Sequence, residues 1–174
     1  RCPGRRRVRS RPAVSYAPHP GEKFPDFLAR PALLQSGKAS LTLEPMEIRP
    51  VATSEAPTPA GHYSQAIVHQ GLVYVAGQLP IDPATGEKKT GPIEEQAEQV
   101  LKNVRAILQA AGSDLDRVLK MTVYISDIGL WGRVNEVYAR MFGAHRPARA
   151  VVPVNELHHG FKIEIEAIAA VKEQ

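Results

Sequence analysis

The sequence predicts an α+β fold in which a single β-sheet is covered on one face by two helices. Two longer segments place apolar residues at helical spacing, over 93–111 and 129–141. Short segments rich in β-branched or alternating apolar residues surround them, which gives the order β-β-α-β-α-β-β. One sheet with both helices on the same side is the natural packing for this order. The five predicted strands are 64–69, 72–78, 119–126, 148–154 and 161–171.

Turn residues separate the first predicted strands. Gln70-Gly71 joins the strands 64–69 and 72–78, and this pair is typical of tight turns. A second turn follows at 82–86, where Asp, Pro, Thr and Gly are gathered. One further short strand is expected ahead of these, around 47–53.

The two helices have recognisable ends. The first is expected to open after Thr90-Gly91-Pro92, with two glutamates in its first turn, where the helix dipole favours acidic side chains. Gly112 then supplies its stop. The second helix is expected to begin at Asp127 or Gly129 and to run through Met141. On that helix, Trp131 and Tyr138 are interpreted as core residues rather than as a stacking platform.

The length of the chain and its pattern of apolar residues indicate the number of domains and whether the protein self-associates. Its 174 residues support one domain with a sizeable core, and are too few for two ordinary domains. With both helices on one side, the second face of the sheet would still present Val, Ile and Ala side chains. Association with further copies of the chain would cover that face, so self-association is expected.

Positive charge is concentrated at the start of the chain. Residues 1–45 hold nine Lys or Arg, three acids and seven of the 15 prolines. The net charge of +4 therefore comes from this segment, and residues 46–174 are mildly acidic, which argues against general nucleic-acid binding. Residues 1–45 are predicted to be a disordered, basic extension and 46–174 the folded domain. We interpret the extension as upstream or added sequence, with a targeting peptide or a nucleic-acid-binding arm as the alternatives.

The motifs of common cofactor and metal sites are missing from the sequence. There is no phosphate-binding glycine loop, no Gly-x-Ser-x-Gly and no His/Cys/Asp cluster at metal-ligand spacing, so neither a cofactor nor a metal is predicted. Cys2 is the single cysteine, which excludes an internal disulfide. No stretch approaches the ~18 apolar residues that a membrane span requires. His158-His159 lack a third ligand and are interpreted as exposed loop residues.

Arg149 stands out because it lies within the apolar strand predicted at 148–154. Burying a guanidinium without an anionic partner is costly. Two interpretations remain open: Arg149 pairs across strands with Glu164 or Glu166, or it binds a substrate carboxylate through a two-pronged hydrogen bond. Arg146 lies three residues earlier, and in an extended segment this offset would place it on the opposite face.

The last predicted strand alternates acidic and apolar residues. Glu164 and Glu166 share one face, and Ile163 and Ile165 share the other. Two carboxylates at this spacing could polarise a water molecule, or could simply solvate the sheet.

Several short motifs follow one another along residues 51–171. They include Gly61-His62-Tyr63-Ser64-Gln65-Ala66, Val75-Ala76-Gly77-Gln78-Leu79-Pro80, Val134-Asn135-x-x-Tyr138, Pro147-Ala148-Arg149 and Glu164-Ile165-Glu166-Ala167. Each motif is short, but their presence in this order is specific, and together they resemble the motifs of the RidA (YjgF) family. This sequence departs from the family pattern at Ala76, where serine is common, at Val151, where cysteine is common, and at Arg146, where phenylalanine is usual.

The resemblance implies a chorismate-mutase-like fold and a homotrimer with a central barrel, whose sites lie between subunits. It also implies a cofactor-independent deaminase that hydrolyses 2-imino acids, such as 2-iminobutyrate, or their enamines to 2-oxo acids and ammonia. Arg149 would bind the substrate carboxylate, and Glu164 would orient the water. Tyr63, which lines the cleft, is the third implied catalytic residue beside Arg149 and Glu164. The other implied substrate-binding residues are Asn135, Ala76 and the backbone near Gly77 and Val151.

Other functions stay open on the sequence alone. A non-catalytic trimer that binds small carboxylates would also use Arg149, and an RNA-directed translation inhibitor or ribonuclease is a second alternative. A small 2-imino acid is the expected ligand, and neither a membrane nor a nucleic acid is an expected partner. The expected compartment is the cytoplasm, or the mitochondrion if residues 1–45 are a targeting peptide.

Overall fold

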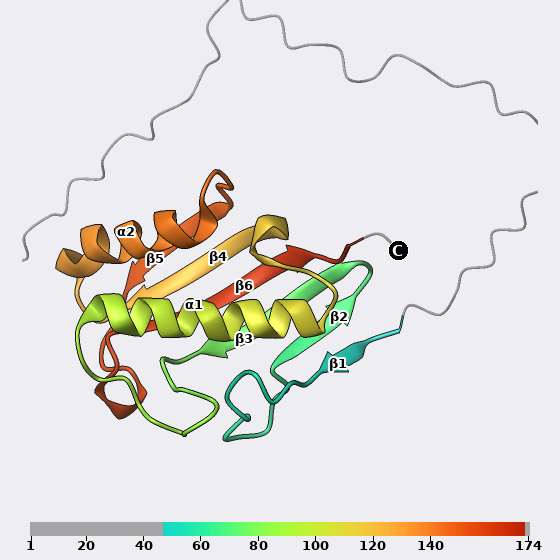
Figure 1. Ribbon diagram of the computed structural model, residues 1–174, viewed down its shortest axis with the longest axis horizontal. Coiled ribbons are helices and arrows are strands. Elements are labelled where there is room, and N and C mark those ends of the chain that lie inside the picture. The colour runs from blue at the N-terminus through green and yellow to red at the C-terminus, as the bar shows by residue number, and fades with distance from the viewer. Residues whose placement is uncertain (1–46, 173–174) are drawn as a thin grey trace, which may run out of the picture. The chain divides into compact units, whose positions relative to one another are not determined.

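The computed structural model describes residues 47–172, so the predicted 1–45 extension lies outside the described part of the chain. These residues form one six-stranded sheet with two α-helices on a single face, as the sequence predicts (Figure 1). The strands are β1 (Arg49–Val51), β2 (Ala66–His69), β3 (Leu72–Gln78), β4 (Val118–Ile125), β5 (Ala148–Pro153) and β6 (Ile163–Ala170), and the helices are α1 (Ile93–Ala110) and α2 (Trp131–Phe142).

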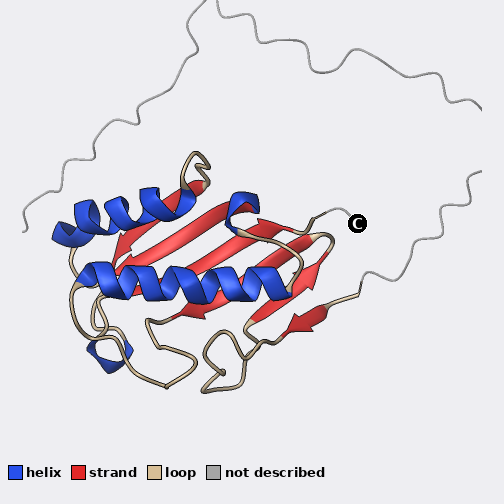
Figure 2. Cartoon of the chain, viewed as in Figure 1, coloured by secondary structure: helices blue, strands red, loops and turns tan. Residues whose placement is uncertain are grey.

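The strand order explains why both helices share a face. The sheet runs β1-β2-β3-β6-β4-β5, with β4 and β5 parallel and every other pair antiparallel. The connections β3-α1-β4 and β4-α2-β5 both step across the sheet in the same direction. Since such crossovers are almost always right-handed, two steps in one direction bring their helices to the same side. Figure 2 shows both helices in front of the strands.

The predicted elements are confirmed, and the differences lie at their ends. The early strand expected around 47–53 is β1, and the second helix starts at Trp131, after a 3-10 turn over Ile128–Leu130. β6 begins two residues later than expected because the Phe161 N–H donates to the His158 carbonyl and closes a turn instead of joining the sheet. Phe161 is nevertheless buried in the protein interior.

Alternation along β4 and β6 separates a buried face from an open one. Met121 and Val123 of β4 and Ile163 and Ile165 of β6 are fully buried with the apolar side of α1. The residues between them, such as Glu164, lie on the face that no helix covers. Because side chains in a strand alternate between faces, the helix-facing set fixes which residues reach the open face.

A β-bulge interrupts the pairing of β3 with β6. Val75 pairs with Ala167 and Gln78 with Ile165, so two residues of β3, Ala76 and Gly77, lie opposite one residue of β6. The extra residue keeps the buried Gln78 on the helix-facing side. It also brings Gly77 close to Glu164 of β6, where a larger side chain would have to displace the carboxylate.

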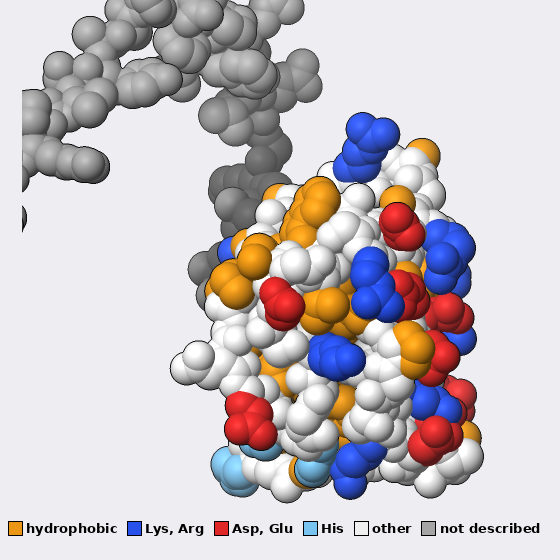
Figure 3. All heavy atoms as spheres, turned by 90° about the vertical axis from the view of Figure 1, so that its left-hand side faces the viewer, with side chains coloured by type: hydrophobic (Ala, Val, Ile, Leu, Met, Phe, Trp, Pro, Cys, Tyr) orange, Lys and Arg blue, Asp and Glu red, His pale blue; other side chains and the backbone are white. Residues whose placement is uncertain are grey.

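Opposite charges pair over the outer surface of the helices. Arg133 and Arg140 of α2 contact Glu94 and Glu98 of α1, and acidic and basic side chains gather along the right edge of Figure 3, on the side of the helices. These pairs are exposed, so each contributes little stability. Within residues 47–172, none of the helices has the length and apolarity needed to cross a membrane.

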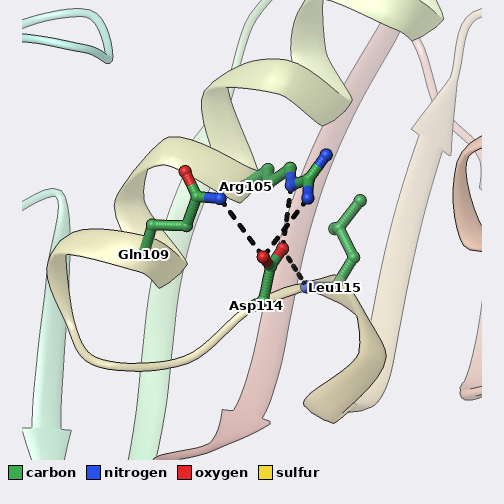
Figure 4. Close-up of polar contacts among 4 residues, drawn as sticks. All are labelled: Arg105, Gln109, Asp114 and Leu115. Atoms are coloured by element: carbon green, nitrogen blue, oxygen red, sulfur yellow. Dashed lines mark hydrogen bonds and ion pairs between the residues drawn. The ribbon is translucent and has the colours of Figure 1, made fainter.

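The turn between α1 and β4 is anchored by Asp114. The predicted stop, Gly112, has φ +82°, a left-handed conformation that glycine adopts without strain. Asp114 then accepts hydrogen bonds from Arg105, from Gln109 and from the backbone N–H of Leu115 (Figure 4). Partial burial acts to raise the pKa of Asp114, but these donors outweigh it and the pKa is lowered.

Replacing Asp114 should weaken this turn. Asp114→Ala removes the carboxylate that caps this turn and that accepts hydrogen bonds from three donors. We therefore expect a loss of about 1–2 kcal/mol in the free energy of unfolding. Urea denaturation at neutral pH measures it as a lower midpoint with an unchanged m-value. Asp116→Ala, two residues on and exposed, is the matched control. Equal losses in the two variants would contradict the anchoring role.

Candidate functional site

Arg149 is held by neutral partners and has no acidic one. It lies on β5 beside the buried Met121 of β4, which directs its side chain to the helix-covered face. Its Nη2 donates to Asn135 Oδ1 at 2.8 Å, and its guanidinium carbon lies 4.5 Å from the ring centre of Tyr138. The expected alternative, pairing with Glu164 or a neighbouring acid of the same strand, is wrong because β4 separates β5 from β6.

A concave region lies beside Arg149, and we call it the Arg149 hollow. Its volume is about 470 Å³, within the range of small-molecule sites. Arg146 lines it too, so the expectation that the two arginines lie apart is wrong. The pleat that would separate them begins only at Ala148, where β5 starts. The lining residues are Asn135, Tyr138, Ala139, Phe142, Gly143, His145, Arg146, Pro147 and Arg149.

Two aromatic residues of α2 differ from their predicted roles. Tyr138 is buried as expected, but its ring forms the platform under Arg149 that the sequence analysis missed. Tyr138 lies three residues after Asn135, so both are on one face of the helix, and this spacing could have indicated from the sequence that Tyr138 belongs to the same site. Trp131 is 46% exposed and therefore not a core residue, and its ring lies 5.9 Å from the Arg149 guanidinium. Burial raises the pKa of Tyr138 to about 12 despite the opposing effect of Arg149, so its hydroxyl stays protonated.

Glu164 lies on the other face of the sheet, against Gly77. A Cβ built on Gly77 would clash with Glu164 Oε1, so any larger residue at this position would have to displace the carboxylate. Glu164 makes no hydrogen bond to a described residue, whereas Glu166 accepts one from the Tyr124 hydroxyl at 3.2 Å. Burial raises the pKa of Glu164; His158 acts to lower it and Glu166 to raise it. Because it makes no hydrogen bond to a described residue, the ionised Glu164 carboxylate has free acceptor positions for a water molecule.

A second concave region, the Tyr63 hollow, lies near Glu164. Its volume is about 300 Å³, and its lining includes Tyr63, Gly77, His158 and His159. Tyr63 is 53% exposed, with its hydroxyl 3.4 Å from the Ala60 N–H. Both histidines are exposed, as the sequence predicts, and belong to a turn at the lower left of Figure 1; histidine side chains are visible at the same end in Figure 3.

Five of the seven expected site residues therefore fall into two groups. Arg149 and Asn135 line the Arg149 hollow, while Tyr63 and Gly77 line the Tyr63 hollow beside Glu164. The remaining two line neither hollow: they are Ala76, whose N–H donates to the Gln65 carbonyl, and Val151, which packs against the core. Among residues 47–172, no three His, Asp, Glu or Cys side chains are grouped to hold a metal ion.

The sequence pattern of this fold matches a known family. Residues 53–171 match the family described as Endoribonuclease L-PSP. The chain belongs to this family. Since its relatives include RidA itself, the RidA (YjgF) resemblance of the motifs is confirmed.

Individual relatives of the family cover most of the folded region. A RutC family protein of Pyrococcus horikoshii is 50% identical over 119 residues, which are 68% of this chain and 94% of that protein. The 2-iminobutanoate/2-iminopropanoate deaminase of Rattus norvegicus is 46% identical over 68% of this chain and 87% of its own length. Among solved structures, RidA from Psychrobacter is 40% identical with a TM-score of 0.68, covering 71% of this chain and 99% of that one. E. coli TdcF with bound serine is 38% identical, also with a TM-score of 0.68 and with the same coverage.

The raised pKa of Glu164 implies that the stability of the folded protein depends on pH. The folded protein holds this proton more tightly than the unfolded chain, so the resulting stabilisation is present at low pH and is lost as pH rises through the folded-state pKa. Glu164→Gln removes a half-buried charge, and we expect it to raise stability at about pH 7 by less than about 1 kcal/mol, because solvent screens the exposed part.

Urea midpoints across the pH range measure this effect. The gain from Glu164→Gln should shrink toward zero below about pH 4, where the carboxyl is protonated in both states. Glu156→Gln, which changes an exposed loop carboxylate, is the control and should have no comparable effect. A gain that is the same at every pH would show that burial of the charge is not its cause.

Proposed function

We propose that this protein hydrolyses reactive 2-imino acids and their enamine tautomers to 2-oxo acids and ammonia, without a cofactor. The observation that carries the proposal is the Arg149 guanidinium. It is oriented by Asn135 and Tyr138, lines a hollow, and has no ion-pair partner among the described residues. A guanidinium held in this way is suited to bind a planar carboxylate through two parallel hydrogen bonds. The relatives named 2-iminobutanoate/2-iminopropanoate deaminase support the same reaction class.

Hydrolysis of the imine mainly requires that the protein orient the substrate and a water molecule. With its carboxylate on Arg149, the substrate presents the electrophilic carbon of its C=N bond. Glu164 accepts a hydrogen bond from a water molecule and takes a proton as the water oxygen bonds to that carbon. Glu164 then gives this proton to the nitrogen of the resulting carbinolamine and takes up the hydroxyl proton as the C=O bond forms and the C–N bond breaks, so ammonia leaves and the 2-oxo acid remains. Such imines also hydrolyse in water, so orientation and modest electrostatics suffice.

We propose that each site is formed between two protomers of a homotrimer. Within one protomer Arg149 lies on the helix-covered face of the sheet and Glu164 on the open face, so one small substrate does not contact both. β5 is also the last strand of the sheet, with one side of its backbone free of a strand partner in the described protomer. A neighbouring copy placed along this edge would bring its own Glu164, with Tyr63 and Gly77, toward Arg149.

Substitution of Arg149 tests the reaction and its carboxylate anchor together. We expect the protein to accelerate hydrolysis of freshly generated 2-iminobutyrate, and Arg149→Ala to lower kcat/KM by about 100-fold, because a charged two-pronged contact is lost. Arg149→Lys keeps the charge but loses the planar fork, so it should restore only part of the rate. Arg140→Gln, an exposed arginine paired with Glu98, is the control.

Two results would contradict the proposal. If the folded protein gives no acceleration over buffer, the deaminase is refuted for this substrate. If it binds 2-oxobutyrate through Arg149 nonetheless, the ligand-binding alternative is favoured. Equal losses in Arg149→Ala and Arg140→Gln would show that the arginine anchor is not the cause.

Mixed trimers test the shared site. Arg149→Ala and Glu164→Gln protomers are each expected to be inactive alone. Unfolding them together and refolding them should restore about one site in four, because a site with Arg149 from one protomer and Glu164 from its neighbour is then intact at that frequency. The 2-oxo acid produced from 2-iminobutyrate measures the recovery. No recovery from a mixture that forms trimers would place both residues in the same protomer's site.

A further inference from the structure

The Arg149 hollow contains a second arginine that the proposed reaction does not use. Arg146 and Arg149 both line it, and no Asp or Glu is among its lining residues. Arg146 makes no hydrogen bond or ion pair with any residue that the structure describes, so its guanidinium is free for a ligand. Two cations without a neutralising acid make this hollow a favourable place for an anion with two charged ends.

The segment that carries Arg146 is fixed from both sides. Before it, His145 Nε2 lies 2.8 Å from the Val118 carbonyl oxygen, and because a carbonyl only accepts, this nitrogen carries the proton. The His145 ring also stacks on Phe142, with 6.2 Å between ring centres. After it, Pro147 restricts the backbone and leads into β5. Arg146 therefore extends into the hollow from an anchored backbone rather than from a free loop.

We propose that Arg146 makes this protein selective for 2-imino acids that bear a second carboxylate on their side chain. Arg149 binds the carboxylate next to the imine, as in the proposed function on which this inference rests, and Arg146 binds the distal one. A volume of about 470 Å³ accommodates a dicarboxylate of four or five carbons, which is small for a site of this size. A substrate with an aliphatic side chain would leave Arg146 without a partner.

The test compares two stable product-like ligands that differ only at the far end. 2-Oxoglutarate and 2-oxopentanoate share a five-carbon 2-oxo acid skeleton, with a carboxylate in the first replaced by a methyl group in the second. Titration calorimetry at low ionic strength should show about tenfold tighter binding of 2-oxoglutarate to the unmodified protein, because Arg146 adds one charge-assisted contact. Raising the salt concentration should reduce this ratio, since Arg146 is exposed.

Variants assign the preference to Arg146. Arg146→Gln should bring the affinity ratio of the two ligands to within about twofold, while Arg140→Gln, an exposed arginine outside the hollow, should keep it near tenfold. An unmodified protein that binds both ligands equally would overturn the proposal. The proposal would also be overturned if Arg146→Gln and Arg140→Gln changed the affinity ratio of the two ligands by the same factor.

Turnover separates this inference from the proposed function. The imines of glutamate and of 2-aminopentanoate, generated by an amino-acid oxidase, provide the reactive counterparts of the two ligands. If neither imine is hydrolysed while the binding preference and its dependence on Arg146 persist, the deaminase is refuted and the selectivity stands. If both are hydrolysed at the same kcat/KM and Arg146→Gln leaves that ratio unchanged, the selectivity is refuted and the deaminase stands.

Discussion

The packing of one face of β4 and β6 in the core beneath the helices determines on which side of the sheet Arg149 and Glu164 lie. Met121 on β4 and Ile165 on β6 are fully buried in that contact, and strand alternation then turns Glu164 to the open face. β5 joins β4 in parallel register with Arg149 beside Met121, so Arg149 inherits the helix-facing direction. A slip of one residue in either pairing would turn one of these two groups to the other face of the sheet, so that both would lie on the same side. The buried apolar contact therefore fixes the chemistry of both faces before any polar interaction forms.

The bulge in β3 is the second constraint, because it decides what surrounds Glu164. Because two residues of β3 lie opposite one residue of β6, the buried Gln78 stays on the helix-facing side and Gly77 lies close to β6. With no Cβ at Gly77, the Glu164 carboxylate fits against the backbone and is partly removed from water. A larger residue there would have to push the carboxylate outward. The glycine thus matters through the space it leaves and not through its backbone freedom, since its φ is not in the left-handed region.

Periodicity predicted the layers well because burial and period are directly linked: the spacing in α1 and the alternation in β6 each specify one face. It could not specify which strands are neighbours. That missing information made pairing of Arg149 with Glu164 look feasible, although β4 lies between their strands. It also misplaced Arg146, because where β5 begins depends on its pairing with β4 and not on local composition. Trp131 looked like a core residue because its type is usually buried, and only the packing of the helix shows that it is exposed.

The partners of Arg149 explain how a cation can be positioned without losing its capacity to bind. A carboxylate partner would orient the guanidinium but neutralise it, and a ligand would then have to compete with that ion pair. Asn135 and the Tyr138 ring orient it through a neutral amide oxygen and the negative face of an aromatic ring. Asn135 and Tyr138 lie one helical turn apart on α2, so the position of that helix over β5 sets the direction in which the guanidinium points. Affinity for a carboxylate in this fold is therefore controlled as much by the packing of α2 as by the arginine itself.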